Sequence, residues 1–472
     1  MLRQKGTVLI TAIIFVLLIA VRFSVLDNPP AEYHGWRQSD TEAMARNFIV
    51  GNGSIFYPQL NYDGAPPNYA QLEFQLTTFF IAILYRLFGY YYFLARLVPL
   101  VFFLGSAYYL YRLAKDLEGQ EAGWLTLVVY GMFPFSVIFS RAIMPEAAAL
   151  FFLIGGVYYF LVWQKNERRW TLLLLGAGFT ALAISQKIPA IYIGVPMAYL
   201  VFHKDGLAAL RKSSVWIFMF LSLVPNILYF IWLEGVAQTN YVTGIATNLL
   251  LPAWREGGIA LEAWDFLSKA LLRAYTPLGL LLALVGLFCQ RNRQKRFIWA
   301  WAIAAILEIV FVAAVIQLDY YLLLIAPLVA LLAGFALQRL FRLRVVRSLV
   351  VLFVVLITLQ SYVSRDIYCA VNQKLLDCAQ VVQNNTGETD LLVLGNYSPE
   401  LLNLSRRYGW RANIFYPQKP EEEAALFQRG GATYFVVIDN QIEGDSDGSY
   451  LEYLENNYQK LELAQGVTLY QY

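Results

Sequence analysis

Long apolar runs separated by short polar or basic loops dominate the chain. The first run covers about twenty residues from Thr7 to Leu26, after Arg3 and Lys5, and is about as long as the hydrocarbon core of a bilayer requires. The Asp27–Pro30 sequence that follows is typical of a helix stop and lacks the small residues of a cleavage site. We therefore interpret the run as a retained first membrane helix.

Eleven further apolar segments follow the first. They lie at about 73–88, 92–113, 122–140, 146–163, 170–186, 188–203, 214–233, 274–290, 296–316, 320–338 and 346–363. If all of them crossed the membrane, the positive-inside rule would fail. If 73–88 does not cross, sixteen Lys and Arg residues fall on inner loops, eighteen with the N-terminal pair, and the short outer turns hold only Arg141 and Lys187.

This charge distribution predicts a polytopic α-helical membrane protein with about eleven transmembrane helices and a cytoplasmic N-terminus. Segment 73–88 carries Glu73, Gln75 and Arg86 among its apolar residues, so we expect an amphipathic interfacial helix in the first outer loop. The transmembrane domain is predicted to cover residues 1–363, with outer loops at 27–91 and 234–273.

Residues 364–472 are expected to form a small extracytoplasmic α/β domain. Apolar runs predict strands at 391–395, 433–438 and 467–470, and helical spacing covers 399–408 and 450–458. Because this block carries no recognisable catalytic motif, it is interpreted as an accessory or acceptor-docking module. The second outer loop contains Trp254 and Trp264 and an amphipathic stretch near 258–273, which indicates an interfacial helix or a surface that receives substrate.

Composition supports the membrane class and excludes others. The 472 residues are 58% hydrophobic and 15% charged, and the net charge of +3 is too small to suggest nucleic acid as a partner. Three cysteines exclude a disulfide framework. Cys369 and Cys378 are either a pair or two separate thiols. His34 and His203 are the only histidines, and they are predicted on opposite sides, which excludes a multi-histidine zinc site.

Ionisable side chains gather at the predicted outer ends of the helices. They are Asp40 after the first helix, Arg141 and Glu146 around one turn, Lys187 at the next, and Asp319 with Tyr320 at a later one. Charges commonly lie at helix ends, which explains any one of them. Together, carboxylates and cations suit the joining of a hydroxyl to a sugar carbon that loses an anionic phosphate.

Glu308 is different because it lies within a predicted span. A lone carboxyl group in hydrocarbon is costly, so we expect it to be protonated or packed inside the bundle, while an ion-coupled carrier would use it for transport.

Several of these segments resemble a known family. The segment Trp36–Thr41, the following Ala43–Phe48, the double proline Pro66-Pro67 and the Ser140–Glu146 turn are similar to the polytopic C-type glycosyltransferases. Among these they most resemble the protein-O-mannosyltransferase and aminoarabinose-transferase-like branch, glycosyltransferase family 39. The resemblance covers about residues 7–340, and Asp319-Tyr320-Tyr321 also looks like a late outer turn of that branch.

The resemblance implies roles for several residues. It makes Asp40 the catalytic base and places Pro66 and Pro67 at the lipid-phosphate site. Many relatives have Lys before the prolines, where this chain has Ala65. The phosphate would then depend on other cations.

The candidate cations are Arg37, Arg141 and Lys187. His34, Gln38, Asp319 and Tyr320 are further candidate substrate contacts. Glu146 is a metal ligand, an acceptor contact or a helix cap, and a carboxylate at a helix start is favoured by the helix dipole alone.

The predicted activity is transfer of a sugar, with inversion, from a polyprenyl-phosphate donor to a hydroxyl of a glycan, lipid or protein on the outer face. The sequence assigns no cofactor and leaves a divalent metal open. The alternatives are a polymerase or ligase with a diphosphate-linked donor, and a transporter of lipid or glycan that makes no bond. A bacterial inner membrane fits the short loops.

Overall fold

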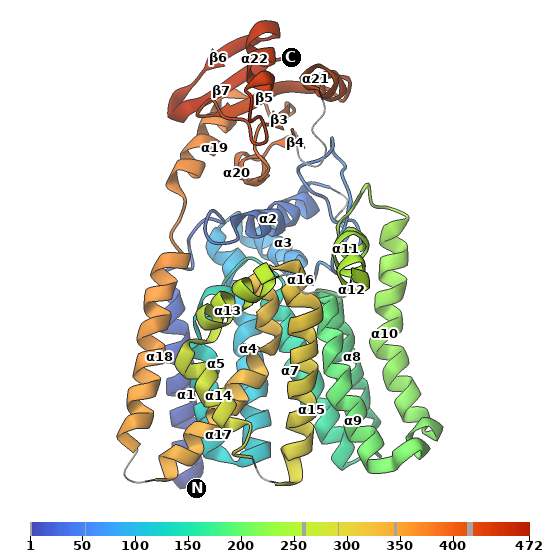
Figure 1. Ribbon diagram of the computed structural model, residues 1–472, viewed down its shortest axis with the longest axis vertical. Coiled ribbons are helices and arrows are strands. Elements are labelled where there is room, and N and C mark those ends of the chain that lie inside the picture. The colour runs from blue at the N-terminus through green and yellow to red at the C-terminus, as the bar shows by residue number, and fades with distance from the viewer. Residues whose placement is uncertain (1, 52, 257–260, 291, 344–346, 413–418) are drawn as a thin grey trace. The chain divides into compact units, whose positions relative to one another are not determined.

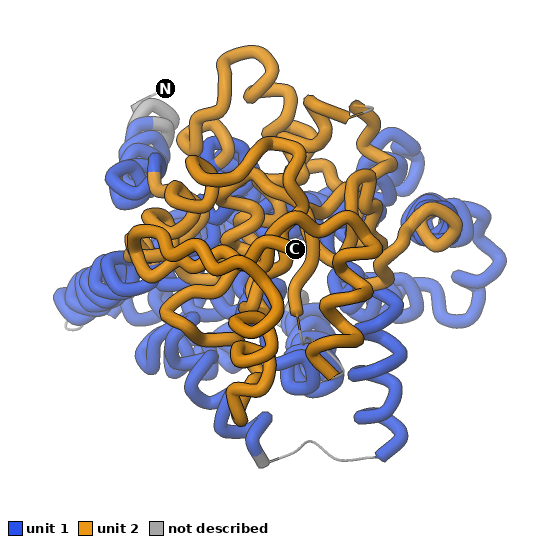
Figure 2. Tube along the Cα trace, turned by 90° about the horizontal axis from the view of Figure 1, so that it is seen from above, with its two compact units in different colours: residues 1–27, 96–232, 242–368 blue, residues 28–95, 233–241, 369–472 orange. Residues whose placement is uncertain are grey.

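The computed structural model describes residues 2–51, 53–256, 261–290, 292–343, 347–412 and 419–472, which are mainly helical (Figure 1). Two compact units make up the chain (Figure 2). Unit 1 consists of residues 1–27, 96–232 and 242–368, and unit 2 of residues 28–95, 233–241 and 369–472. The first predicted outer loop therefore belongs to the same unit as the terminal α/β block.

Unit 1 is built almost entirely from helices. Its α-helices are α1 (Leu2–Phe23), α4 (Tyr92–Glu118), α5 (Gln120–Met132), α6 (Pro134–Phe139), α7 (Glu146–Lys165), α8 (Trp170–Gln186), α9 (Gly194–Asp205), α10 (Ser213–Glu234), α11 (Tyr241–Ile245), α12 (Leu251–Glu256), α13 (Leu261–Tyr275), α14 (Pro277–Gly286), α15 (Asn292–Glu308), α16 (Ala314–Ile316), α17 (Ala326–Arg342) and α18 (Arg347–Tyr368), of which α4, α10 and α11 extend into unit 2. Short 3-10 helices η1 (Ile188–Ile193), η2 (Gly206–Arg211) and η5 (Asp319–Ile325) and π-helical turns η3 (Ala246–Leu250) and η4 (Ile309–Ala313) connect or interrupt them.

The described helices include six that are long and apolar enough to cross a membrane, or seven if α13 and α14, bent by 88°, count as one span. The membrane-protein class is thus confirmed, and the count of eleven stays a prediction. Apolar runs alone overestimate helix length because they continue across helix breaks. The run at 274–290, for example, contains the end of α13, the break at Thr276 and the ten residues of α14.

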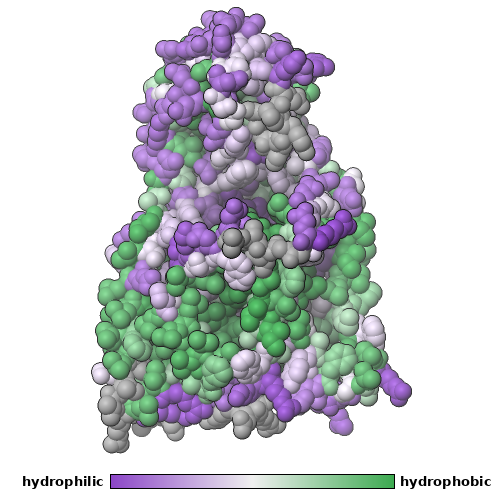
Figure 3. Space-filling view, in the orientation of Figure 1, coloured by the Kyte–Doolittle hydropathy of each residue, from purple (hydrophilic) through white to green (hydrophobic). Residues whose placement is uncertain are grey.

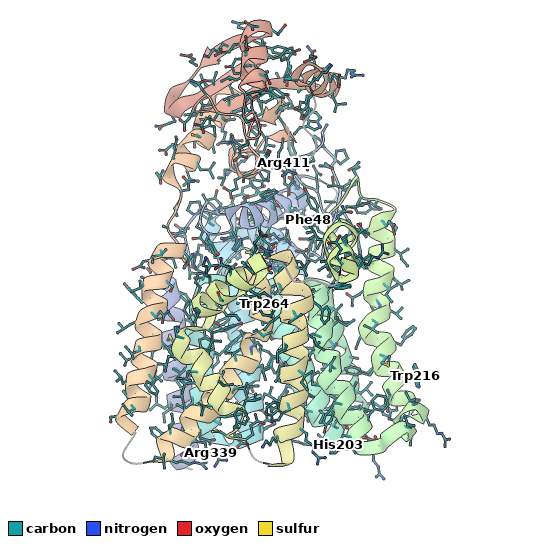
Figure 4. The ribbon with its side chains drawn as sticks, viewed as in Figure 1. Phe48, His203, Trp216, Trp264, Arg339 and Arg411 are labelled. Carbon is teal, nitrogen blue, oxygen red and sulfur yellow. The ribbon has the colours of Figure 1, made fainter. Side chains whose placement is uncertain are left out.

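The side chains of unit 1 follow the pattern of a bilayer. Apolar residues cover the visible face of its helices, and polar residues lie at the helix ends (Figure 3). His203 and Arg339 lie at the same end (Figure 4), as the positive-inside assignment predicts for two inner loops.

Unit 2 combines helices with two sheets. Its elements are α2 (Gly35–Val50), β1 (Ala70–Gln71), α3 (Leu76–Phe88), β2 (Thr239–Asn240), α19 (Gln373–Asn385), β3 (Leu391–Leu394), α20 (Glu400–Ser405), β4 (Tyr408–Arg411), α21 (Pro420–Arg429), β5 (Ala432–Ile438), α22 (Ser449–Asn457), β6 (Gln459–Glu462), η7 (Ala464–Gly466) and β7 (Val467–Gln471). Strands β1 and β2 pair in parallel.

The larger sheet has the order β4-β3-β5-β7-β6, with β4, β3 and β5 parallel and β7 antiparallel to both of its neighbours. Side chains alternate between its faces. Leu392 and Leu394 pack with α19 and α20, whereas Val393 packs with α21 and α22. The expected strands correspond to β3, β5 and β7. The helix expected at 399–408 is shorter, because Arg406 adopts a left-handed conformation (φ 57°) and β4 begins at Tyr408.

Helix α3 is the segment that the charge distribution excluded from the spans. Its thirteen residues extend about 20 Å at 1.5 Å per residue, less than the roughly 30 Å of a hydrocarbon core. Thr77, Ile81 and Tyr85 are buried on one face, and α3 contacts α2. The helix is confirmed, and its position in the interface stays a prediction.

The cysteines are free thiols in the structure. Cys369 and Cys378 are both buried, and the Cys378 thiol lies 3.6 Å from the carbonyl oxygen of Gln465. Of the two alternatives from the sequence, the structure shows two separate thiols.

Candidate active site

Helix α2 carries Asp40 and begins directly after the predicted first membrane helix. His34 at its N-terminus has a left-handed conformation (φ 55°) that turns the chain into the helix. Most of α2 is buried, polar residues included, because the helix contacts both α3 and α20. Each buried polar group therefore needs a partner. Glu42, for example, forms an ion pair with Arg46 at 2.7 Å.

Both carboxylate oxygens of Asp40 accept hydrogen bonds from neutral groups. The Tyr62 hydroxyl donates to Oδ2 at 2.9 Å, and the Asn403 side-chain amide donates to Oδ1 at 2.8 Å. Asp40 is only 4% exposed. The three residues come from α2, the loop before β1, and α20, so unit 2 brings distant parts of the chain together around this carboxylate.

The guanidinium of Arg411 forms cation–π contacts with Tyr62 and Trp36. The Arg411 guanidinium lies 4.5 Å from the ring centroid of Tyr62 and 5.0 Å from that of Trp36. Two of its nitrogens bind the carboxylate of Asp63, at 2.9 and 2.5 Å. The indole nitrogen of Trp36 donates to the Tyr62 hydroxyl at 3.2 Å, which leaves the hydroxyl proton directed at Asp40.

Burial decides the protonation behaviour of the site. Loss of solvation on burial raises the pKa of Asp40 from 3.8 to about 6. The charge of Arg37, the hydrogen bonds from Asn403 and Tyr62, and the charge of Arg411 each act in the opposite direction. Burial, followed by the charge of Asp40, raises the pKa of Glu400 to about 7. A carboxylate with a pKa near 6 is mostly ionised at neutral pH and is basic enough to accept a hydroxyl proton.

The other predicted residues of the first outer loop have structural contacts. Arg37 forms an ion pair with Glu73. Gln38 donates to the carbonyl oxygen of Tyr33 at 2.8 Å and to Glu32 at 3.2 Å. His34 is half-buried and its ring packs against Tyr33. Pro66 and Pro67 are exposed.

Unit 1 holds a second polar cluster. Lys187 binds Glu146 at 2.7 Å, and both side chains are buried. The Lys187 ammonium lies 4.6 Å from the ring centroid of Tyr320 and 5.0 Å from that of Tyr321. Glu146 is the first residue of α7, where the helix dipole favours a carboxylate. The structure thus brings together three residues that the sequence predicted for the site.

Arg141 and Asp319 also lie in unit 1. Arg141 is fully buried and donates to the carbonyl oxygen of Val25 at 2.9 Å, so it ties the end of α1 to the turn before α7. Asp319 is buried and lies 3.4 Å from Arg273 of α13.

An open cavity of about 710 Å³ lies along α13. Its lining includes two cations one helical turn apart, Lys269 and Arg273, and two carboxylates, Glu262 and Asp265. Phe266, Leu272 and Gln317 complete it. Lys269 is 69% exposed and forms an ion pair with Asp265, which is equally open to solvent. The cavity is open to solvent and has both acidic and basic side chains in its lining.

Glu308 ends α15, and the π-helical turn η4 follows it directly. Its side chain is buried, and neither carboxyl oxygen has a hydrogen-bond partner among the residues that the structure describes. The same part of the chain contains no group of three or more His, Cys, Asp or Glu side chains arranged to hold a metal ion.

A sequence match and the fold now show what the chain resembles. The family model described as dolichyl-phosphate-mannose-protein mannosyltransferase matches residues 75–232, which include Glu146 and Lys187. ArnT from Cupriavidus metallidurans, in a structure bound to undecaprenyl phosphate, is similar with a TM-score of 0.70 at 13% identity, over 98% of this chain and 97% of that chain. The chain has the fold of the GT-C membrane glycosyltransferases.

Other GT-C structures extend the likeness. The oligosaccharyltransferase AglB from Archaeoglobus fulgidus, in complex with an inhibitory peptide and a dolichol-phosphate, has a TM-score of 0.61 at 11% identity and covers 99% of this chain and 74% of that chain. The arabinofuranosyltransferase AftD from Mycobacteria has a TM-score of 0.55 at 13% identity, over 99% and 40%. No curated protein matches the chain in sequence. The predicted resemblance to this fold family is confirmed.

The sequence did not indicate every side chain around Asp40 of this GT-C chain. Tyr62, Asn403 and Arg411 carry no motif, and two of them lie in the block that was interpreted as accessory. The aromatic residues near Asp40 were the available signal for Tyr62. For Asn403, the sequence offered none.

Proposed function

We propose that the protein is a glycosyltransferase that moves a sugar from a polyprenyl-phosphate donor to a hydroxyl group on a glycan, lipid or protein acceptor, with Asp40 as the general base. One observation carries the proposal. A buried carboxylate with a raised pKa, whose two oxygens are oriented by neutral donors, lies on α2 of a chain with the GT-C fold.

The chemistry follows from these contacts. The acceptor hydroxyl donates its proton to Asp40 while its oxygen attacks the anomeric carbon. The bond from that carbon to the phosphate oxygen breaks, and the electron pair leaves with the lipid phosphate. Attack from the face opposite the leaving group inverts the anomeric carbon. Asn403 and Tyr62 orient the carboxylate, and burial keeps its pKa raised in spite of their hydrogen bonds.

The lipid phosphate requires cations. We assign Lys269 and Arg273 of unit 1 to this role, because they line an open cavity. All four cations have a carboxylate partner, but the side chains of Lys269 and Arg273 are 69% and 37% exposed. The sequence candidates Arg37 and Lys187 are mostly buried in their ion pairs with Glu73 and Glu146, so they are less accessible to a phosphate. Arg141 is buried against a backbone carbonyl, and we interpret it as structural. The outer face of a bacterial inner membrane is the proposed location.

The test measures sugar transfer from radiolabelled polyprenyl-monophosphate donors to an acceptor hydroxyl, with the purified protein in detergent or vesicles. Asp40→Asn should lower kcat by about 100-fold or more, the usual contribution of a general base. Glu423→Gln is the matched control, since it removes another buried carboxylate of unit 2. Near-normal turnover by a folded Asp40→Asn variant would exclude the assigned base.

The same assay separates the alternatives. A polymerase or ligase would use only diphosphate-linked donors. A transporter would move labelled lipid across the vesicle membrane without forming a new glycosidic bond.

A further inference from the structure

Helix α20 fixes Asn403 against α2 through three hydrogen bonds. The Asn403 amide nitrogen donates to Asp40 Oδ1 at 2.8 Å and to the Ser39 hydroxyl at 3.0 Å. Arg46 of α2 donates to the Asn403 backbone carbonyl at 2.7 Å. Asn403 is 1% exposed. Its side chain therefore has little freedom to leave the carboxylate.

The chemistry of an amide suits this place. A Lys or Arg donor would form an ion pair with Asp40 and lower its basicity. A carboxamide donates a hydrogen bond without carrying charge, and it does not titrate in the physiological range. It can orient one oxygen of the carboxylate and leave the other electron pairs available to a proton.

The remaining groups that face Asp40 come from several elements. Positive charge comes from Arg37 of α2 and Arg411 of β4, and negative charge from Glu400 of α20. The hydroxyls of Tyr62 and Tyr241 are the other titratable groups. Glu400 and Asn403 lie on the same short helix, so α20 presents both a neutral donor and a second acid to the site.

We propose that Asn403 is a positioning residue for Asp40, and that α20 makes the terminal α/β part of the chain a component of the catalytic machinery. This inference rests on the proposed function of Asp40. It gives the terminal block a role in the reaction itself, in addition to any role in acceptor docking.

The pH dependence of kcat tests the proposal, because a merely structural residue would not move it. Asn403→Ala and Tyr62→Phe each remove one hydrogen bond to the charged form of Asp40, so each should shift the acid limb of the profile upward by about one pH unit. The KM for the lipid donor should stay unchanged. Ser405→Ala is the control, since Ser405 is buried on the same helix and donates back to Leu401; its profile should match that of the wild type.

Asn403→Asp is the second variant, since it is isosteric and keeps the packing of α20 if the alanine variant fails to fold. A carboxyl group at this position should shift the acid limb further upward than Asn403→Ala does. A folded Asn403 variant whose acid limb stays at the wild-type pH overturns the inference. If Asp40→Asn itself retains activity, the proposed function fails instead, so the two failures are distinguishable.

Discussion

The Arg411 guanidinium lies 4.5 Å from the ring centroid of Tyr62, whose hydroxyl donates to Asp40 at 2.9 Å. Arg411 belongs to strand β4 of the terminal sheet and Asp40 to α2. The environment of the proposed base is thus set by the chain's C-terminal region as well as by the first loop.

Activity should fall on the acidic side of neutrality. Asp40 accepts a proton only when it is ionised, and its pKa of about 6 places the midpoint of the acid limb near that pH. The value of kcat/KM should rise with pH through this midpoint and then level off. A pH profile between 4.5 and 8, with unfolding measured at each pH, checks the expectation. An acid limb centred near pH 4 would contradict the raised pKa.

Asp40→Asn should stabilise the fold above pH 6. The folded protein holds the Asp40 proton more tightly than the unfolded chain, since the pKa rises from 3.8 to about 6. Wild-type stability therefore decreases as pH rises between these values and stays low above them. Removing the charge should restore up to about 3 kcal/mol at pH 8 and almost nothing near pH 4. Equal changes in melting temperature at both pH values would refute the burial effect.

Glu146 and Lys187 should stabilise the fold only as a pair. Removal of one partner from a buried ion pair leaves an uncompensated charge, at a cost of about 3–5 kcal/mol. Glu146→Leu alone should lower the melting temperature strongly, and the double variant with Lys187→Met should recover most of the loss. Thermal unfolding in detergent measures both. Sugar transfer by the double variant then decides whether Glu146 has a chemical role. If the double variant folds but transfers no sugar, Glu146 acts in the reaction. If it folds and transfers sugar, Glu146 only stabilises the start of α7.

Lys269→Ala should weaken donor binding. Lys269 lines the cavity along α13 and is mostly exposed, so its loss should leave the fold intact. We expect KM for the lipid donor to rise several-fold with little change in kcat, and the effect to shrink at high salt because exposed charges are screened. Lys374→Ala, which removes an exposed lysine from its ion pair with Asp439, is the control. An unchanged KM would remove Lys269 from the phosphate site.

The membrane class could be predicted from the sequence because it depends on local properties. Apolar runs and the placement of Lys and Arg identified the helices of unit 1, and the polar residues of α3 led to the prediction that it does not span. The same reasoning failed at helix breaks such as Thr276, which separates α13 from α14, because a bend does not change hydropathy.

The candidate site also has residues that the sequence could predict and residues that it could not. Asp40, Glu146 and Lys187 were predicted because they lie next to helix ends in an otherwise apolar sequence. The positions of Asn403 and Arg411 near Asp40 could not be predicted, because long-range contacts leave no periodic pattern. The interpretation of residues 364–472 as an accessory module had the same origin, because the block has no motif of its own. That interpretation stays a prediction.

The place of Asn403 in the chain has a consequence for biogenesis. A ribosome makes α20 after α2 and after every predicted membrane helix. Until then the carboxylate on α2 lacks one of its two orienting groups. If Asp40 is the base, a nascent chain would thus remain a poor catalyst, and sugar transfer would begin only once α20 has folded against α2.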